Sequence, residues 1–491
     1  MTKKNKNFKK GMIMINVLVF SMLAISLLTF FISWASSSLT ISKSTLYKEQ
    51  AFQIAEAGID YYRWHLAHSP NDFKDGTENN GPYTHVFYDK DGVAIGSFIL
   101  TITPPITGST IVTIKSEGRV NQYPSIKRTI QARLAIPSFA KFAIVANDFM
   151  RFGEGTEVFG PIHSNSGIRF DGIAHNLITS AVSTFNDPDH IGNNEFGVHT
   201  HVNINNSNVT ESFRPLEAPP TNPVQTRNDV FIIGRQFPVP QSDFTGITND
   251  LSVIKTNAQS GGKYLAPSGK LGYHIVLKTN DTYDLYRVNS LASATNSCSS
   301  NSNFGDPTWG TWSIKASNGQ SLIGNFNNPT NGLIFVEDNV WVDGQINTAR
   351  ITIAAGKFPD NPSQRKNIFI NNDLLYTNYD GQDSIGLIAQ EDVTVGMISE
   401  DNLRIDAALM ANNGRAGRHY YGSQCSPYHL RSLLTLYGMI GSNQRYGFAY
   451  TNNTGYDIRT IIYDANLLYG PPPSFPLTSD KYTTISWDEI E

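Results

Sequence analysis

The sequence predicts a mainly β protein with a long α-helix at its N-terminus. An uncharged run covers residues 12–35, apolar residues then recur at heptad spacing as far as Leu66, and most of the remaining chain consists of short apolar runs separated by Asn, Asp and Gly. We expect a small α+β unit after the helix, followed by a parallel β-solenoid of the right-handed β-helix kind. A β-sandwich is the alternative. The length of 491 residues suggests about three domains.

The composition excludes one class of partner. There are 38 basic and 42 acidic residues, for a formal net charge of −4. The chain therefore lacks the basic field that attracts proteins to nucleic acid, and we expect no nucleic-acid partner. The 45 Asn outnumber all Asp and Glu together. Because Asn tolerates the left-handed backbone conformation, this predicts many turns.

Residues 1–11 form a basic leader ahead of a predicted membrane-spanning helix. The leader carries five lysines and no acidic residue, and Met12–Ala35 then has no charge over 24 positions. As a helix this run is about 36 Å long, enough to cross a bilayer with some tilt, and it is longer than the apolar core of a cleaved secretory signal. The positive side stays in the cytoplasm, which places the chain from about residue 36 outside. A buried core helix is the other interpretation.

The helix is predicted to continue to residue 68, because no Pro occurs between Met12 and Pro70. A hinge at Ser36–Ser38, which would give two helices, is the alternative. We expect the first half in lipid, whereas the second half needs a protein partner. Its apolar side chains recur at spacings of three and four, as in the seam of a packed helix: Phe52, Ala55, Ile59, Tyr62 and Leu66.

Two stretches of this region resemble type IV pilins and pseudopilins. Lys9-Lys10-Gly11 before an uncharged run is similar to their prepilin peptidase site, and Glu49–Gly58 is similar to the segment after the membrane helix in PilX-type minor pilins. The resemblance covers residues 9–68. It implies cleavage after Gly11 by prepilin peptidase, with Met12 as the mature N-terminus. It also implies that Asn16 and the apolar seam pack against other pilin-like subunits in a filament.

One position departs from the pilin pattern. Most major pilins carry Glu at the fifth position after the cut, where it neutralises the terminal amine of a neighbouring subunit, but this chain has Asn16. An unpaired amine in a low-dielectric bundle is costly, and Asn accepts a hydrogen bond without cancelling the charge. The departure favours a minor or tip subunit over a major one, and it leaves a plain membrane anchor open.

Alternating runs predict a small antiparallel β unit over residues 69–138, which fits the pilin plan of a helix followed by a meander. We divide the rest into first solenoid rungs at 139–199, an irregular β insertion at 200–330, and the main solenoid domain with the C-terminal tail at 331–491. Residues 331–487 resemble an uncharacterised bacterial β-helical domain attached to PilX-like N-termini. That family provides no activity to carry over.

Acidic and aromatic residues in the predicted rungs are candidates for glycan chemistry. Asp338, Asp373 and Asp392 recur at similar motif positions; stacked on one side they would bind calcium or supply an acid–base pair for sugar cleavage, but a repeated corner residue is first a turn former. We predict no catalytic residue. Seven aromatic residues would line a glycan-binding strip or, more commonly, simply pack: Tyr420, Tyr421, Tyr428, Tyr437, Tyr446, Phe448 and Tyr450.

His199 and His201 would share one strand face as a metal-binding pair, with Asp189 and His190 upstream. No third ligand has a diagnostic spacing, so we interpret these histidines as surface or turn residues. Asn186–Gly192 begins like an acidic calcium loop but lacks an oxygen ligand at its fifth position and Glu at its twelfth, which favours an Asx turn. We therefore predict no metal site and no cofactor.

The two cysteines, Cys298 and Cys425, have no C-x-x-C spacing, which excludes a zinc ribbon or a thioredoxin-like motif. In an extracellular setting they can pair, and two buried free thiols are the alternative.

These features predict a single-pass membrane protein with a cytoplasmic N-terminus and an extracytoplasmic β head at the cell surface or on a pilus. We expect a PilX-like minor pilin or pseudopilin in type IV pilus-type filament assembly or adhesion. The bulky head favours a tip or low-copy position, with a surface glycan or a host or cell ligand as a partner. We expect no enzymatic activity. The alternative is a tethered extracellular protein that binds or cleaves polysaccharide.

Overall fold

The computed structural model describes residues 8–190, 192–204, 212–244, 247–295, 298 and 309–490. Most of the predicted leader lies outside these residues. The chain forms two compact units. The first unit holds the chain up to Pro104, the segment Val112–Leu134 and the C-terminal residues from Tyr482. The second holds Pro105–Ile111 and Ala135–Lys481.

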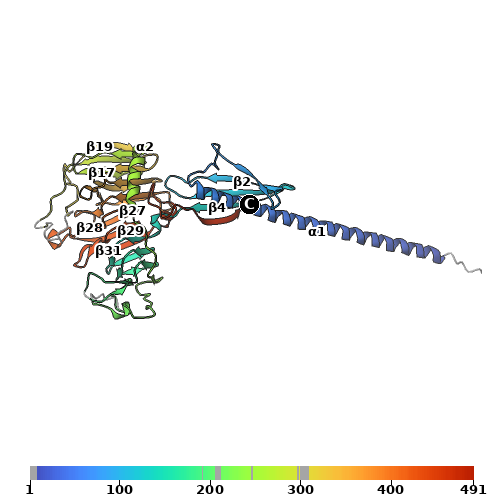
Figure 1. Cartoon of the computed structure of the whole chain (residues 1–491), viewed down its shortest axis with the longest axis horizontal. Helices are drawn as coiled ribbons and strands as arrows, with labels where there is room; N and C mark the ends of the chain where they lie inside the picture. The colour runs from blue at the N-terminus through green and yellow to red at the C-terminus, as the bar shows by residue number, and fades with distance from the viewer. Residues whose placement is uncertain are drawn as a thin grey trace, which may run out of the picture. The chain divides into compact units, whose positions relative to one another are not determined.

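Helix α1 (Phe8–His68) is continuous through the serines where a hinge was the alternative. Figure 1 shows it as a long rod that runs far past the sheet of its own unit. The prediction of one long N-terminal helix is confirmed. Every described side chain from Met12 to Leu39 is exposed, whereas the face that begins at Ala51 is buried. The helix therefore has a free half and a packed half.

The packed half of α1 lies on an antiparallel sheet in the first unit. The strand order is β1-β2-β3-β4-β32, and β1 to β4 pair antiparallel in sequence. The last strand comes from the C-terminus, so the chain leaves this sheet after β4, builds the second unit and then returns. The bounds are Tyr83–Tyr88 for β1, Ala94–Thr103 for β2, Val112–Val120 for β3, Tyr123–Ala135 for β4 and Thr483–Ile490 for β32.

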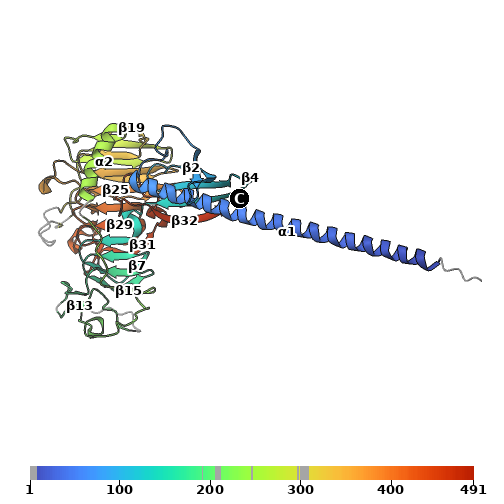
Figure 2. The same cartoon turned by 45° about the vertical axis from the view of Figure 1, so that its right-hand side comes forward.

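The second unit is dominated by parallel pairing within a 22-stranded sheet. One ladder runs through seven strands in the spatial order β20, β22, β25, β27, β29, β5 and β8. Figure 2 shows part of this stack from β25 through β29. Pairing of this kind differs from the antiparallel sheets of a β-sandwich. The bounds are Leu333–Val336, Arg350–Ala355, Ser384–Ala389, Asn402–Ala411, Leu430–Ser442, Ile144–Ala146 and Ile162–Ser164.

Aliphatic side chains stack at one register position of this ladder and form the core of the unit. The register pairs Ile353 with Leu387 and then Leu387 with Leu409. Leu409 pairs in turn with Ile440, and Ile440 with Ile144. All five are fully buried, so the step from the C-terminal strands back to β5 continues the same core. The predicted segments 139–199 and 331–491 thus meet in one ladder, and residues 483–490 of the latter lie in the first unit.

A second parallel ladder joins β17 (Gly272–Leu277), β21 (Val340–Gln345), β23 (Ile368–Phe369), β26 (Val393–Val395) and β28 (Ala416–Arg418). Segment 200–330, predicted as an irregular insertion, also contributes β16, β18, β19 and helix α2. Strand β16 pairs parallel with β20, and β18 and β19 extend β17 in an antiparallel way. The bounds are Lys263–Leu265 for β16, Thr282–Val288 for β18, Gln320–Asn327 for β19 and Ile247–Gly261 for α2.

The histidine-rich segment of the second unit lies among short strands. Strand β9 lies between β6 and β14 in a three-stranded sheet, and both of its pairings are parallel. Strand β13 pairs antiparallel with β12 next to it. The bounds are Met150–Phe152 for β6, Ile168–Phe170 for β9, Val198–His199 for β14, Thr184–Phe185 for β12 and Glu195–Phe196 for β13. The remaining strands are β7 (Thr156–Phe159), β10 (Ile173–Ala174), β11 (Ile178–Ser180), β15 (Arg235–Gln236), β24 (Leu374–Leu375), β30 (Ala449–Tyr450) and β31 (Thr454–Tyr463).

Candidate membrane anchor and a buried histidine cluster

The free half of α1 is apolar on all sides. Large apolar side chains from Met12 to Leu46 are more than half exposed, with Phe20 at 71% and Trp34 at 64%. The apolar window has a mean hydropathy of 2.4 and contains no buried residue, so the helix is long and apolar enough to cross a membrane. A continuous apolar surface of this size is far larger than soluble monomers expose, and it marks a lipid or protein contact. Asn16 lies in this exposed half, and Gly11 lies in the first turns of the same helix.

The packed half of α1 uses its apolar seam against its own sheet. Ala55, Ile59, Tyr62 and Leu66 are at most 3% exposed. They share one core with strand residues such as Leu100 and Ile114. Phe52 is half-buried, and its ring lies 5.8 Å from that of Trp487 on β32. The partner that this seam needed is therefore the chain's own sheet, and four of the five seam residues have no surface left for a neighbouring subunit.

A glycine sets how closely the helix approaches the sheet. A Cβ atom added to Gly118 on β3 would lie 2.0 Å from the carbonyl oxygen of Ala51 and 2.5 Å from the nitrogen of Ala55. Both contacts are with helix backbone, which cannot rotate away as a side chain can. Glycine at this position therefore allows direct contact between the strand and the helix backbone.

The structure joins Cys298 to Cys425 in a disulfide across 127 residues of sequence. Both residues are buried beside Met397 and Tyr421. Disulfides form and persist in oxidising compartments outside the cytoplasm. This bond is therefore the arrangement expected if the second unit lies outside the cell membrane.

The three acidic residues considered for glycan chemistry serve corners of the fold. Each carboxylate accepts a hydrogen bond from a backbone N–H of a different segment: Asp338 from Ser268 (3.0 Å), Asp373 from Arg404 (2.7 Å) and Asp392 from Arg415 (2.8 Å). Such bonds hold a carboxylate in one orientation and stabilise its charge. Three of the seven aromatic residues considered for glycan binding are buried instead: Tyr421, Tyr446 and Phe448 are at most 5% exposed.

The histidines of segment 187–201 are buried, which corrects their interpretation as surface or turn residues. His199 and His201 are fully buried, and the His190 side chain is 2% exposed. Parallel pairing of β14 with β9 sets Val198 beside Ile168 in the core and His199 beside Arg169. Asp187, in the loop after β12, contacts both side chains on that second face.

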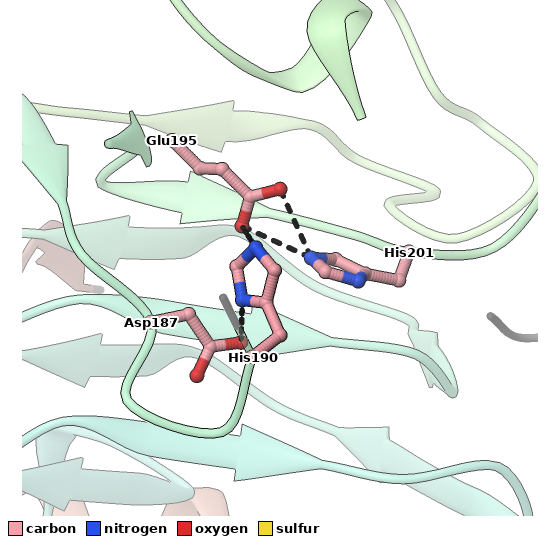
Figure 3. A group of neighbouring side chains, drawn as sticks. All are labelled: Asp187, His190, Glu195 and His201. Atoms are coloured by element: carbon pink, nitrogen blue, oxygen red, sulfur yellow. Dashed lines mark hydrogen bonds and ion pairs between the residues drawn. The ribbon is translucent and has the colours of Figure 1, made fainter. Parts of the chain in front are cut away.

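Two carboxylates converge on these rings. His201 Nε2 lies 3.0 Å from Glu195, and His199 Nε2 lies 2.8 Å from the same carboxylate. His190 Nδ1 lies 3.4 Å from Asp187 Oδ2 (Figure 3). Four donor groups, Asp187, His190, Glu195 and His201, keep one ligand atom each within 4.8 Å of all the others, an arrangement able to hold a metal ion.

Asp189, considered with the histidines in the sequence, is not part of the cluster. Its carboxylate pairs with Arg445 Nη1 at 3.0 Å and with Arg151 at 3.4 Å. Burial raises the pKa of Asp189, but the hydrogen bond and charge of Arg445 lower it further, so the net shift is downward. Asp187 and Glu195 take its place; the sequence pattern offered Asp187 only as part of a calcium-loop-like segment and did not point to Glu195. The sequence does place Asp187 and Asp189 two residues apart in a predicted turn. This spacing indicates that one of them can point toward the histidines, but it does not indicate which one.

Comparisons with known proteins add a distant likeness. No protein-family model matches the chain. No curated protein matches it either. Among solved structures it is similar to the competence-associated pilin ComZ from Thermus thermophilus, with 15% sequence identity and a TM-score of 0.31 over 90% of this chain and 97% of that chain.

Proposed function

We propose that this chain is a membrane-anchored, surface-exposed minor pilin or pseudopilin of the PilX-like kind, acting in filament assembly or adhesion. The observation that carries the proposal is the division of α1. Its free half is apolar all round and exposed, while its packed half is buried on its own sheet. A helix that is apolar on every face suits a lipid or helix-bundle environment. A pilin-type subunit needs both halves. The exposed half lies in the membrane before assembly and in the helix bundle of the filament afterwards, and the packed half carries the head.

Processing belongs to this proposal. Lys9-Lys10-Gly11 precedes the uncharged run, and prepilin peptidase cuts between Gly11 and Met12. Five lysines in residues 1–11 keep the leader in the cytoplasm until the cut.

Filament contacts come from the exposed half of the helix, at Asn16 and the apolar residues that follow it. Because Asn16 cancels no charge on a neighbouring amine, dense repetition of the subunit is disfavoured. The protein takes a tip or low-copy position. The other pilin-like subunits contact it through α1 and leave its head free.

The head is an extracytoplasmic β-solenoid formed by the two parallel ladders. The uninterrupted column of buried aliphatic residues supports this arrangement, and the disulfide supports its extracytoplasmic location. A surface glycan or a ligand on a host or neighbouring cell binds the head.

The mature N-terminus tests the proposal. Whole-chain mass spectrometry of protein from the membrane fraction of a host with prepilin peptidase is expected to show loss of residues 1–11. Gly11→Val is expected to block the cut, and the control Asn16→Gln, five residues beyond it, to be cut as the parent is. Intact residues 1–11 on the parent chain would contradict the pilin assignment and favour a tethered surface protein.

The alternative, a tethered enzyme that cleaves polysaccharide, requires two carboxylates about 5–10 Å apart in a groove. The corner aspartates are held by backbone bonds instead. In the surface hollow lined by Lys141 and His163, Asp243 is the single carboxylate among the described lining residues. If the full chain in detergent cleaved any member of a panel of glycans, the enzyme would be favoured over the pilin-like protein.

A further inference from the structure

Five metal-ligating side chains meet in the buried cluster of the second unit: three imidazoles and two carboxylates. They are supplied by the loop after β12, by β13 and by β14 with the residues that follow it: Asp187, His190, Glu195, His199 and His201. Figure 3 shows four of them pointing toward one another.

Three ring nitrogens of the cluster lack a hydrogen-bond partner among the described residues. They are both nitrogens of His190 and Nε2 of His199. The His190 side chain is 2% exposed and that of His199 is fully buried. Buried polar atoms almost always have a partner, so these nitrogens, of which His199 Nε2 lies 2.8 Å from Glu195 in an ion-pair contact, need an explanation beyond packing. Nitrogen lone pairs that face carboxylates without hydrogen-bond geometry are what an intervening cation produces.

The separations of the donor atoms suit a bound transition metal. In a tetrahedral site with bonds of about 2.0–2.1 Å, neighbouring ligand atoms lie about 3.3 Å apart. The nearest contacts between His201 and Glu195 are 3.0 Å, those between His190 and Asp187 are 3.4 Å, and His190 Nε2 lies 3.9 Å from Glu195. Both His190 distances exceed a normal hydrogen bond, and the one from Nδ1 to Asp187 is close to the edge of such a tetrahedron, whereas the one from Nε2 to Glu195 is longer.

A backbone contact orients His199. Its Nδ1 lies 2.9 Å from the carbonyl oxygen of Phe196, and only a protonated nitrogen donates there. In the neutral ring Nε2 then carries the lone pair, directed at Glu195 and Asp187. Metal-binding histidines are held in this way by a hydrogen bond from the second ring nitrogen.

The charge balance also favours a cation. Asp171 and Asp187 pair with the guanidinium of Arg169, and the carboxylate of Glu195 contacts the imidazole of His199; these four charged side chains are at most 1% exposed. With neutral imidazoles these four groups leave two negative charges in a buried site. Uncompensated buried charge is strongly unfavourable, and one divalent cation would neutralise it.

A proton on His199 is the competing explanation. Burial lowers the pKa of His199, but hydrogen bonds and charges from Asp187 and Glu195 raise it to about 9. That proton would satisfy one nitrogen and supply one positive charge. It would leave both buried nitrogens of His190 without a hydrogen-bond partner among the described residues, whereas an ion bound by His190 takes up one of them.

We propose that this cluster binds one Zn²⁺ ion through His190, His201, Asp187 and Glu195, with His199 as a fifth donor beside Glu195. Imidazole nitrogen suits zinc and disfavours calcium, which takes six to eight oxygens. A buried site with every donor from the protein is typical of a structural ion. The ion fastens the loop between β12 and β13 over β9 and β14, and so closes this end of the head.

Zinc binding is tested on the full chain in detergent, stripped with chelator and desalted, with ZnCl₂ as the probe. Elemental analysis is expected to find about one zinc per chain, and zinc is expected to raise the melting temperature by several degrees. His190→Ala and Glu195→Gln are expected to weaken binding at least tenfold. The controls are His163→Ala, a buried histidine bonded to Thr179 and Asn165, and Asp189→Asn; both are expected to bind as the parent does.

The parent chain alone can overturn the proposal. Less than a tenth of an equivalent of zinc after loading, or no change in melting temperature, would contradict it without any variant that must fold. Equal zinc affinity in the parent, His190→Ala and Glu195→Gln would also contradict it. Tighter binding of Ca²⁺ than of Zn²⁺ in a parallel titration would reject zinc as the ion.

Discussion

The two halves of helix α1 have similar backbones but opposite surroundings. From Met12 to Leu39 every described side chain is exposed, although most are apolar. From Ala51 to Leu66 one apolar stripe is buried on the sheet, while Glu56, Asp60 and Arg63 face outward. A stripe needs one protein surface, whereas a helix that is apolar all round needs an apolar medium. The comparison teaches that one helix can be shared between a membrane and a domain.

This difference changes which half of α1 is expected to make filament contacts in a pilin-like chain. Four of the five residues of the heptad seam are buried within their own unit, and Phe52 is half-buried. The proposed contacts with neighbouring subunits are therefore assigned to the free half, where the apolar residues surround Asn16. The following predictions test this division, from the largest expected effect to the smallest.

Charges in the free half should abolish membrane anchoring. Leu23→Arg with Leu27→Arg places two guanidinium groups near the middle of the 24-residue uncharged run. Each Arg costs about 2.5–3.5 kcal/mol at the centre of a spanning helix, so the pair costs about 5–7 kcal/mol. We expect the chain to be released from membranes by alkaline carbonate. Ile41→Arg, exposed but beyond the run, is the control and should stay anchored; retention of the double variant would refute the membrane assignment.

Loss of the disulfide should destabilise the second unit without affecting the anchor. Closing a loop of more than 100 residues is worth about 5 kcal/mol in the chain-entropy model, and native disulfides usually contribute about 2–4 kcal/mol. Cys298→Ser with Cys425→Ser should lower the melting temperature and leave carbonate resistance unchanged. Because both cysteines are buried, the side of the membrane is read from a protease added to intact cells, which should cleave the second unit. Cleavage only after lysis would place the head on the cytoplasmic side.

Filling the contact between Gly118 and the helix should loosen the packed half alone. Gly118→Ala drives a Cβ atom into helix backbone, and overpacking of this kind costs about 1–3 kcal/mol. We expect faster hydrogen exchange in β3 and in the second half of α1. Gly153→Ala is the matched control, because the nearest heavy atom to its Cβ would be Arg459 Nη2 at 3.9 Å. Unchanged exchange in Gly118→Ala would mean that the helix does not rest on this strand.

The features that can be predicted best from the sequence are those that depend on interactions between residues close together in the chain. The uncharged run and the heptad spacing of α1 lie within one helix, so its existence and extent could be predicted. The pairing of strands could not be predicted, because β5 pairs with β29, which lies almost 300 residues later in the chain. Hydrophobic periodicity within a strand does not indicate which distant strand it pairs with. The return of β32 to the first sheet was missed for the same reason.

The histidine cluster shows the same limit at the scale of side chains. The spacing of His199 and His201 was visible in the sequence, but the inward turn of Asp187 and the outward turn of Asp189 were not. Arg445, 256 residues from Asp189, holds the second carboxylate away from the rings. An ion pair with a residue distant in the chain therefore helps determine which of two neighbouring aspartates points into the site.

The outer face of β3 gives the smallest predicted effect. Glu117 accepts from Arg119 Nε at 2.6 Å and from Lys127 Nζ at 2.9 Å, on the side of the strand opposite Gly118. Burial raises the pKa of Glu117, but the hydrogen bonds from Lys127 and Arg119 lower it further, and the net shift is downward from 4.5. A lowered pKa in the folded state stabilises the fold above pH 4.5, and this contribution is lost as the pH falls through the folded value.

Glu117→Gln should therefore cost at most about 1 kcal/mol at neutral pH, because both cationic partners are largely exposed to solvent. The difference from the parent should shrink as the pH falls below 4.5, the ordinary value. Lys127→Gln should show the same trend with a smaller amplitude, since Arg119 remains. Thermal unfolding at a series of pH values measures both. A cost that grows toward acid pH would reverse the sign and contradict the ion-pair account, whereas Gly118→Ala on the helix-facing side should show no such pH dependence.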